Sequence, residues 1–511
     1  MSSRPAWVLQ RIPTVIAVII LFMPAHVLPV EMNAQQSGAQ TQPPAEATIR
    51  DQRGVKLAQS GDLTGAIEQF RSALRLSPDY AEAWYHLGLA YDQARETDEA
   101  MAGFEEALRL QPRYLDARYM LADCCRKRGD FAGELDVLAQ VVAQAPQFAE
   151  AHYNYGLALK NRDKIQPAVQ ELRAAVRLSS DNPKYMLALG VALADVDRKE
   201  AVTVLRAAVQ HGGDTAAAHY DLGLALATDG DDTAAEKELN RALELDPKYA
   251  SAQRALGITL MHEGKLDQSA SALRRALELA PSDAEAANNL GSVQLRLKDY
   301  SGAIQTLERA VELNPSLIKA HSSLAQAYQR VNRTIDAQHE SERVASLTVQ
   351  LRNRGRAMID VQSASDQFKS GRTADALATL RDAIDASPNF PDAHLELGRV
   401  IRDSGGDPNE AIAAFRRVLS LDPERAEAHY EIGLTLERAG RKPEALAEYR
   451  IAVEMAPCNM EARRALGQAA LNAGQWSVAA TQFRGVIAFE PHDAEAKRRF
   501  DVAIAQQKVA P

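Results

Sequence analysis

The sequence predicts an all-α protein built as an α-solenoid of about thirteen helix–turn–helix repeats. A pattern of small and large apolar residues returns about every 34 residues along most of the chain. Aromatic residues make up only 5% of a sequence rich in alanine and leucine, which favours helices over a β-sandwich. With 511 residues the chain is too long for one compact core, whereas a solenoid grows by adding neighbours.

The clearest repeat is Ala81–Tyr114. Apolar residues recur at helical spacing in each half of it, and a short polar stretch separates the halves. Gly88 and Ala100 are small where the two helices would cross, and Pro112 cannot continue a helix. One hairpin leaves an apolar flank on each side, so several repeats must stack to bury their flanks.

This repeat resembles the tetratricopeptide repeat. The residues that carry the resemblance are Trp84, Leu87, Gly88, Tyr91, Ala100, Phe104, Ala107 and Pro112. The resemblance implies a right-handed superhelix whose first helices line an inner groove. It also implies a partner that is a protein or an extended peptide.

The N-terminal segment 1–34 is predicted to be a signal peptide or an N-terminal anchor. Arg4 and Arg11 precede the apolar run Val15–Met23, which is short for a membrane span and typical of a secretory signal. We expect an exported protein, periplasmic or secreted, with cleavage after Ala25 or Ala34. The alternative is an uncleaved anchor extending to Val30.

A linker and two groups of repeats follow this segment. Residues 35–46 form a linker rich in Gln, Pro and Ala, predicted to be disordered. Residues 47–351 hold repeats 1–9, and the ninth lacks its closing proline but stays helical in pattern. We expect a break at 352–356, then repeats 10–13 at 357–493. Residues 494–511 are predicted to form a polar C-terminal capping helix and tail.

The third repeat departs from the pattern at the helix crossing. Ala122 replaces the glycine, and Glu134 replaces the crossing alanine. We expect this hairpin to open slightly.

The three cysteines match neither a disulfide framework nor a metal site. Cys124 and Cys125 are adjacent in a predicted helix, and Cys458 lies far away after a closing proline. We expect two small core residues and one loop thiol.

No motif predicts catalysis, a cofactor or a metal. His211–Gly213 lacks the nucleophile motif that accompanies a similar esterase loop, and His262 lacks a second histidine at zinc spacing. Gly264 and Lys265 do not form a phosphate loop, and Asp229–Asp232 lacks the ligands of a calcium loop. We therefore expect a protein that is not an enzyme.

Family positions carried onto this chain place candidate partner-binding residues in the groove. In the N-terminal half they give a stripe of tyrosine and aliphatic side chains, and further along they become polar. The candidates are Tyr85, Leu89, Tyr119, Tyr153, Leu157, Tyr220, Leu224, Arg254, Asn288 and Lys319. The alternative is that the tyrosines only pack against the neighbouring first helix.

The predicted function is a protein–protein interaction scaffold. The net charge of −9 gives no concentrated basic surface for nucleic acid, and we expect membrane contact only through an uncleaved N-terminal segment. One alternative is a substrate-recognition or regulatory partner of a separate enzyme, because the array resembles the repeats of glycosyltransferases of the O-GlcNAc type without their catalytic part. Another is a periplasmic part of an envelope assembly or export machine.

Overall fold

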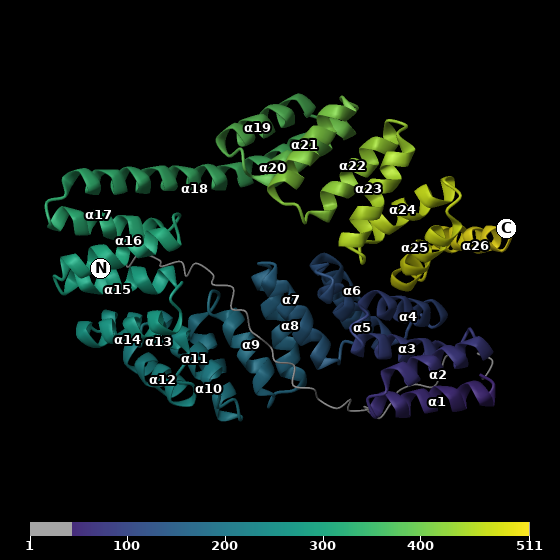
Figure 1. The fold of residues 1–511 in the computed structure, drawn as a ribbon, viewed down its shortest axis with the longest axis horizontal. Coiled ribbons are helices and arrows are strands. Elements are labelled where there is room, and N and C mark those ends of the chain that lie inside the picture. Colours follow the sequence, from purple (N-terminus) through teal and green to yellow (C-terminus); the bar gives the residue numbers. More distant parts are fainter. Residues whose placement is uncertain (1–42, 510–511) are drawn as a thin grey trace.

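The computed structural model describes residues 43–509. They form 26 helices and no strand within this range. In Figure 1 the hairpins run from right to left along the lower part of the molecule, and from α18 onward they return to the right along its upper part. The predicted all-α solenoid is confirmed. The segment 1–34 and most of the linker 35–46 lie outside the described residues; of the linker, only its last residues are described, and helix α1 begins at Ala45.

The first eight repeats are eight helix pairs. Their bounds are α1 (Ala45–Gln59), α2 (Leu63–Leu76), α3 (Ala81–Gln93), α4 (Thr97–Leu110), α5 (Leu115–Lys127), α6 (Phe131–Gln144), α7 (Ala149–Asn161), α8 (Ile165–Leu178), α9 (Pro183–Leu193), α10 (Arg198–Gln210), α11 (Ala216–Asp229), α12 (Asp232–Leu245), α13 (Ala250–His262), α14 (Leu266–Leu279), α15 (Ala284–Arg296) and α16 (Tyr300–Leu313).

The remaining helices complete the array and its cap. Their bounds are α17 (Ile318–Arg330), α18 (Thr334–Lys369), α19 (Thr373–Ala386), α20 (Pro391–Asp403), α21 (Pro408–Leu421), α22 (Ala426–Arg438), α23 (Lys442–Met455), α24 (Met460–Asn472), α25 (Trp476–Phe489) and α26 (Ala494–Val509). Helix α26 takes the place of the expected capping helix.

The expected break at 352–356 is wrong, because α18 runs through it as one helix of 36 residues. The sequence there contains no proline, and one glycine costs a helix only about 1 kcal/mol relative to alanine. The first part of α18 packs on α17 as the second helix of repeat 9. Its last part packs on α19, with Ala357 and Ala364 buried, as the first helix of repeat 10. One helix thus serves two repeats, which gives thirteen hairpins between Ala45 and Phe489.

Each hairpin is fixed by a tight turn and a close crossing. The turn after most first helices has a residue with positive φ, which is glycine in eight turns and Arg95, Asp163, Lys298 or Asn332 in four others. At the crossing in repeat 2, a Cβ added to Gly88 would lie 2.6 Å from the ring of Phe104, so only glycine fits. In repeat 3 the two helices share the smallest contact of any described hairpin, as expected from its altered crossing residues.

The first helices of successive repeats lie on the inner side of the curve. Helices α7, α9, α11, α13, α15 and α17 contact one another in sequence, whereas no described pair of successive second helices makes a comparable contact. A stack is most crowded on its concave side, so the first-helix face is the inner face.

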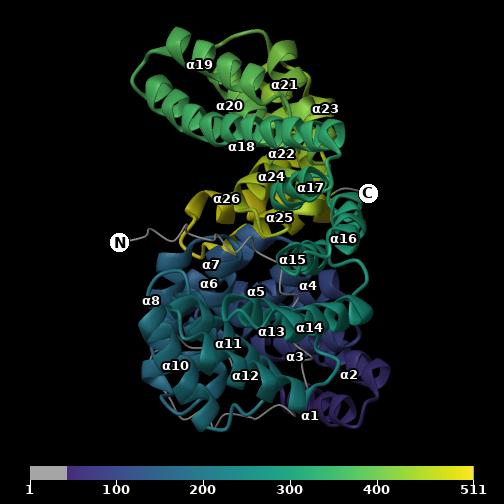
Figure 2. The same ribbon diagram turned by 90° about the vertical axis from the view of Figure 1, so that its left-hand side faces the viewer.

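The end of the array returns to its beginning. Helix α25 packs against α4, and Figure 2 shows α24–α26 between the α19–α23 lobe and the early repeats. The prediction for the cysteines is wrong in part: Cys125 and Cys458 form a disulfide across this contact, while Cys124 is a free, buried core residue as expected. We call this contact, from Cys125–Asp130 and α4 to Cys458–Arg463 and α25, the seam.

Between residues 43 and 509, no helix is both long and apolar enough to span a bilayer.

Candidate functional site

The predicted groove residues lie on the inner, first-helix face, but the tyrosines are turned into the stack. Each ring packs against an aromatic residue at the N-cap or in the first turn of the next first helix. The centroid distances are 4.9 Å for Tyr85–Tyr114, 5.3 Å for Tyr119–Phe148, 5.1 Å for Tyr153–Tyr185 and 5.0 Å for Tyr220–Tyr249. These are ordinary aromatic contacts, and they tie each repeat to the next.

The burial of these tyrosines limits what a partner could reach. Tyr153 and Tyr220 are each 8% exposed, and burial raises the pKa of Tyr153 to about 12. Lys184 lies 4.4 Å from the ring centroid of Tyr153 and covers it further. The structure therefore supports the packing role of these two side chains.

The aliphatic members of the predicted stripe remain half-buried. Leu89, Leu157 and Leu224 each pack at the margin of a core cluster and keep part of their surface exposed. The exposed parts of these three leucines form the apolar surface that the inner face of the N-terminal half offers to a partner.

The polar candidates Arg254, Asn288 and Lys319 differ in their burial and in the partners that their polar groups have within the protein. Arg254 is buried and forms an ion pair with Asp283 at 3.2 Å. Asn288 is buried, and its side-chain oxygen has no hydrogen-bond partner among the described residues. Lys319 is half-buried. The structure does not gather these three into one site, because they lie on α13, α15 and α17.

A recurrent hydrogen bond ties six of the first helices to the turn before them. The fourth residue of the helix, counted as Trp84 is in repeat 2, donates to the carbonyl of the closing proline six residues earlier. The residues that do so are Trp84, Arg118, His152, His321, His394 and Arg463. Four histidines at this position also contact a glutamate on the second helix; the pairs are His152–Glu171, His219–Glu238, His321–Glu340 and His429–Glu448.

These histidines are structural. One ring nitrogen of His152, His219 and His321 contacts a glutamate of the same repeat and the other contacts the turn before the helix, so no nitrogen is left for a ligand. Throughout the part of the chain that the structure describes, no three metal-ligating side chains cluster.

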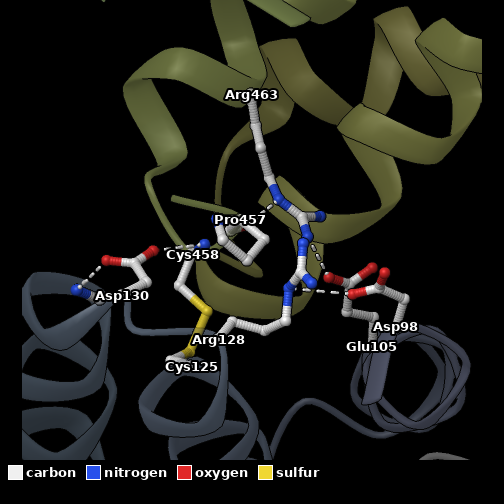
Figure 3. The surroundings of a disulfide bond; sticks show 9 residues. Asp98, Glu105, Cys125, Arg128, Asp130, Pro457, Cys458 and Arg463 are labelled. Atoms are coloured by element: carbon white, nitrogen blue, oxygen red, sulfur yellow. Dashed lines mark hydrogen bonds and ion pairs between the residues drawn. A yellow bond between two sulfur atoms is a disulfide. The ribbon is translucent and has the colours of Figure 1, made fainter. Parts of the chain in front are cut away.

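The seam joins residues 333 positions apart. Cys125 at the end of α5 is bonded to Cys458 in the turn before α24, as Figure 3 shows. The Asp130 carboxylate caps α6 through the Gly133 amide at 2.9 Å, and its other oxygen accepts from the Cys458 amide at 2.7 Å. One buried carboxylate thus orders both sides of the bond.

A buried ion pair lies beside the disulfide. Glu105 on α4 is 2% exposed, and Arg463 on α24 approaches it to 2.6 Å across the seam. Arg484 on α25 lies 3.7 Å from the other oxygen of Glu105. Arg128 donates to the Glu454 carbonyl at 3.0 Å and pairs with Asp98 at 3.2 Å.

Two glycines make room for this contact. A Cβ on Gly133 would lie 2.2 Å from the Cys458 Cβ, and a Cβ on Gly485 would lie 1.5 Å from a guanidinium nitrogen of Arg463. Apolar residues then close the seam, since Cys458, Ala488 and Phe489 belong to the core cluster of the first four repeats.

Sequence reasoning missed the seam residues. Arg118 and Arg463 both stand at the fourth position of a first helix, but Arg50 in repeat 1 does so too, so this pattern does not single out the two repeats that meet.

Comparison with known families agrees with the hairpin geometry. A tetratricopeptide repeat family matches residues 102–147, 191–250, 254–318, 361–405 and 402–459, which is more than half of the chain. Further tetratricopeptide matches cover 54–94, 81–114 and 149–182. The chain belongs to the tetratricopeptide repeat family. It is a protein–protein interaction scaffold of helical repeats, as members of this family are.

Relatives of the tetratricopeptide array match it in part. A BBSome complex member BBS4 homolog of Drosophila melanogaster is 29% identical over 164 residues, which is 32% of this chain and 34% of the relative. The chain thus spans about a third of that curated relative's length. Among solved structures, YrrB, described as a TPR protein with an unusual peptide-binding site, is 23% identical with a TM-score of 0.31, covering 36% of this chain and 95% of YrrB. The APC/C hetero-tetramer Cut9–Hcn1 is 14% identical with a TM-score of 0.35, covering 90% and 97%.

Proposed function

We propose that this tetratricopeptide array is an exported scaffold that holds an extended peptide or partner protein on its first-helix face. The observation that carries the proposal is the continuity of that face. Thirteen hairpins follow one another from Ala45 to Phe489 and leave no interval among the described residues for a catalytic domain. The inner face keeps half-buried aliphatic side chains exposed in part. Both ring nitrogens of His152, His219 and His321 are engaged within the fold.

Export is supported by two independent features. The sequence starts with basic residues and an apolar run typical of a secretory signal. The Cys125–Cys458 disulfide suits an oxidising compartment, because such bonds are rare in cytosolic proteins. Cell fractionation tests this part: we expect the protein outside the cytoplasm, and recovery in the cytoplasm with an intact N-terminus would contradict it.

The groove is tested by substitutions that change the inner face but keep the side chains that pack between repeats. The tyrosines are unsuitable because they pack between repeats. We would instead replace Leu89, Leu157 and Leu224 by glutamate together, cross-link the protein in its native cells, and identify what is attached by mass spectrometry. The matched control replaces three exposed leucines at the ends of second helices, Leu76, Leu245 and Leu313, by glutamate.

We expect the inner-face variant to lose its main cross-linked partner and the control to keep it. Circular dichroism would establish that both variants retain the helical content of the parent. Identical partner profiles for the two folded variants would remove the inner face as the binding surface.

A further inference from the structure

The structure describes three buried arginines, and only two of them have a carboxylate partner. Arg254, 8% exposed, pairs with Asp283, and Arg463, 6% exposed, pairs with Glu105. Arg118, 5% exposed, forms no ion pair with any described residue. Burial lowers the pKa of its guanidinium, and no neighbouring charge opposes that shift. A buried charge without a counter-ion is costly, so its surroundings require an explanation.

Arg118 is nevertheless held firmly in place. One of its terminal nitrogens donates to the Pro112 carbonyl at 2.9 Å, and the other donates to the side-chain oxygen of Gln140. Both acceptors are neutral. The buried Nε–H group has no hydrogen-bond partner among residues 43–509. The side chain is therefore pre-positioned with a full positive charge and an unused donor.

Arg118 lines a cleft at the seam. This cleft has a volume of about 510 Å³ and is lined from both ends of the array. Arg113, Arg118 and Gln140 come from the early repeats, and Phe489, Pro491 and His492 come from the last. No acidic residue lines it, although the whole chain has a net charge of −9.

We propose that this cleft binds the carboxylate group of an organic ligand, with Arg118 as the counter-ion. A guanidinium presents N–H groups in a planar fork that matches a carboxylate, and each terminal nitrogen of Arg118 carries a second N–H beyond the one given to Gln140 or Pro112. Arg113 and His492 stand at the exposed rim, where Arg113 adds a positive charge and His492 adds a polar ring. Phe489 and Pro491 provide an apolar wall for the carbon part of the ligand, which favours an organic acid over a bare inorganic ion. The carboxylate belongs either to a free organic acid or to the C-terminus of a peptide.

Four probes separate these sources in isothermal titrations of the full oxidised protein. Butanoate represents a free acid, N-acetyl-leucine represents a peptide end, N-acetyl-leucinamide is its neutral counterpart, and inorganic phosphate is a bare anion. We expect a carboxylate probe to bind with a Kd of about 1 mM or tighter and the amide not to bind. Binding of N-acetyl-leucine alone assigns the site to peptide ends, and binding of both carboxylates assigns it to organic acids in general. Binding of phosphate without either carboxylate, or binding of no probe, overturns the proposal.

Variants on the two walls locate the binding. Arg118→Gln should weaken the bound carboxylate at least about tenfold, the usual scale for a buried charged partner. His492→Glu changes an exposed residue on the opposite wall, so it tests the site even if Arg118→Gln does not fold, and it should weaken binding severalfold. Arg177→Gln, an exposed second-helix residue with the same change in charge, is the control and should bind as the parent does. Unchanged affinity in His492→Glu, or equal weakening in Arg177→Gln, would place the ligand elsewhere and overturn the proposal.

Discussion

At the scale of single residues, the seam depends on the absence of a side chain at Gly485. Arg463 crosses α25 at this glycine to reach Glu105, and a Cβ would occupy the place of its guanidinium. The flexible arginine can move aside, so the main cost of a larger residue is electrostatic. Glu105 would stay buried with only Arg484 nearby.

We therefore predict that Gly485→Ala lowers the free energy of unfolding by roughly 1–3 kcal/mol, although alanine favours helices. Thermal and urea unfolding of the variant and the parent would measure this loss of stability. The same substitution at Gly355, a helical glycine with open space around it, should stabilise by up to about 1 kcal/mol. In a Glu105→Gln background the Gly485→Ala loss should shrink, and equal losses in both backgrounds would contradict the ion-pair explanation.

Glu134 is a second residue whose environment has a measurable effect, which is on how the free energy of unfolding depends on pH. It stands at a helix crossing where most other repeats have alanine, and burial raises its pKa from 4.5 to about 7. Between these two pH values the unfolded chain has lost the proton while the folded protein keeps it. The folded state is thus favoured by this group at low pH, and that contribution is lost as the pH rises through 7.

Glu134→Gln should remove this dependence. We predict that the variant equals the parent near pH 4 and is more stable by roughly 1–3 kcal/mol at pH 8, where the parent buries a charge. Urea unfolding at a series of pH values would show it. A difference between the two proteins that does not change with pH would contradict the assignment.

At the scale of elements, the hairpin turn was largely predictable from sequence. Eight of these turns have glycine at the positive-φ position, and that position favours glycine because it has no Cβ. The repeat period, the crossing glycines and the capping helix also follow from residues that are near one another in the chain. The break at 352–356 was wrongly expected because the Asn–Arg–Gly run at 353–355 suggests a loop. The structure instead lets α18 pack on α17 at one end and on α19 at the other.

The turn between the two helices of a hairpin gives a prediction that depends on backbone conformation and not on any side-chain contact. Lys298 is exposed and has a φ of 64°, a conformation that costs a residue with a Cβ roughly 1–2 kcal/mol. Lys298→Gly should therefore stabilise the protein by about 1 kcal/mol, and Gly264→Ala at the equivalent turn should destabilise it by a similar amount. Chemical denaturation measures both, and the same sign for both changes would contradict the turn geometry.

At the scale of the whole molecule, the closure of the array could not be predicted. Each repeat adds a small rotation, and the sum over thirteen repeats decides whether the end meets the beginning. No local sequence pattern encodes the total rotation of the thirteen repeats. Cys125 therefore looked like a core residue and Cys458 like a loop thiol, and Glu105, Arg118 and Arg463 gave no sign of a shared surface. The inner-face candidates were placed on the correct face, but their burial depends on the neighbouring repeat.

The closed form also relates the two proposals. The inner face needs only the stack of first helices, whereas the carboxylate cleft needs both ends in contact. Opening the seam would remove the cleft and leave most of the inner face intact.

The most direct test of the closed array is disulfide mapping of the protein from its native cells. The sample would be alkylated without reduction, digested and analysed by mass spectrometry. The structure predicts one cross-linked pair of peptides containing Cys125 and Cys458, with Cys124 present as a thiol once the protein is unfolded. Recovery of all three cysteines as thiols, or of Cys458 joined to Cys124, would contradict the closed array.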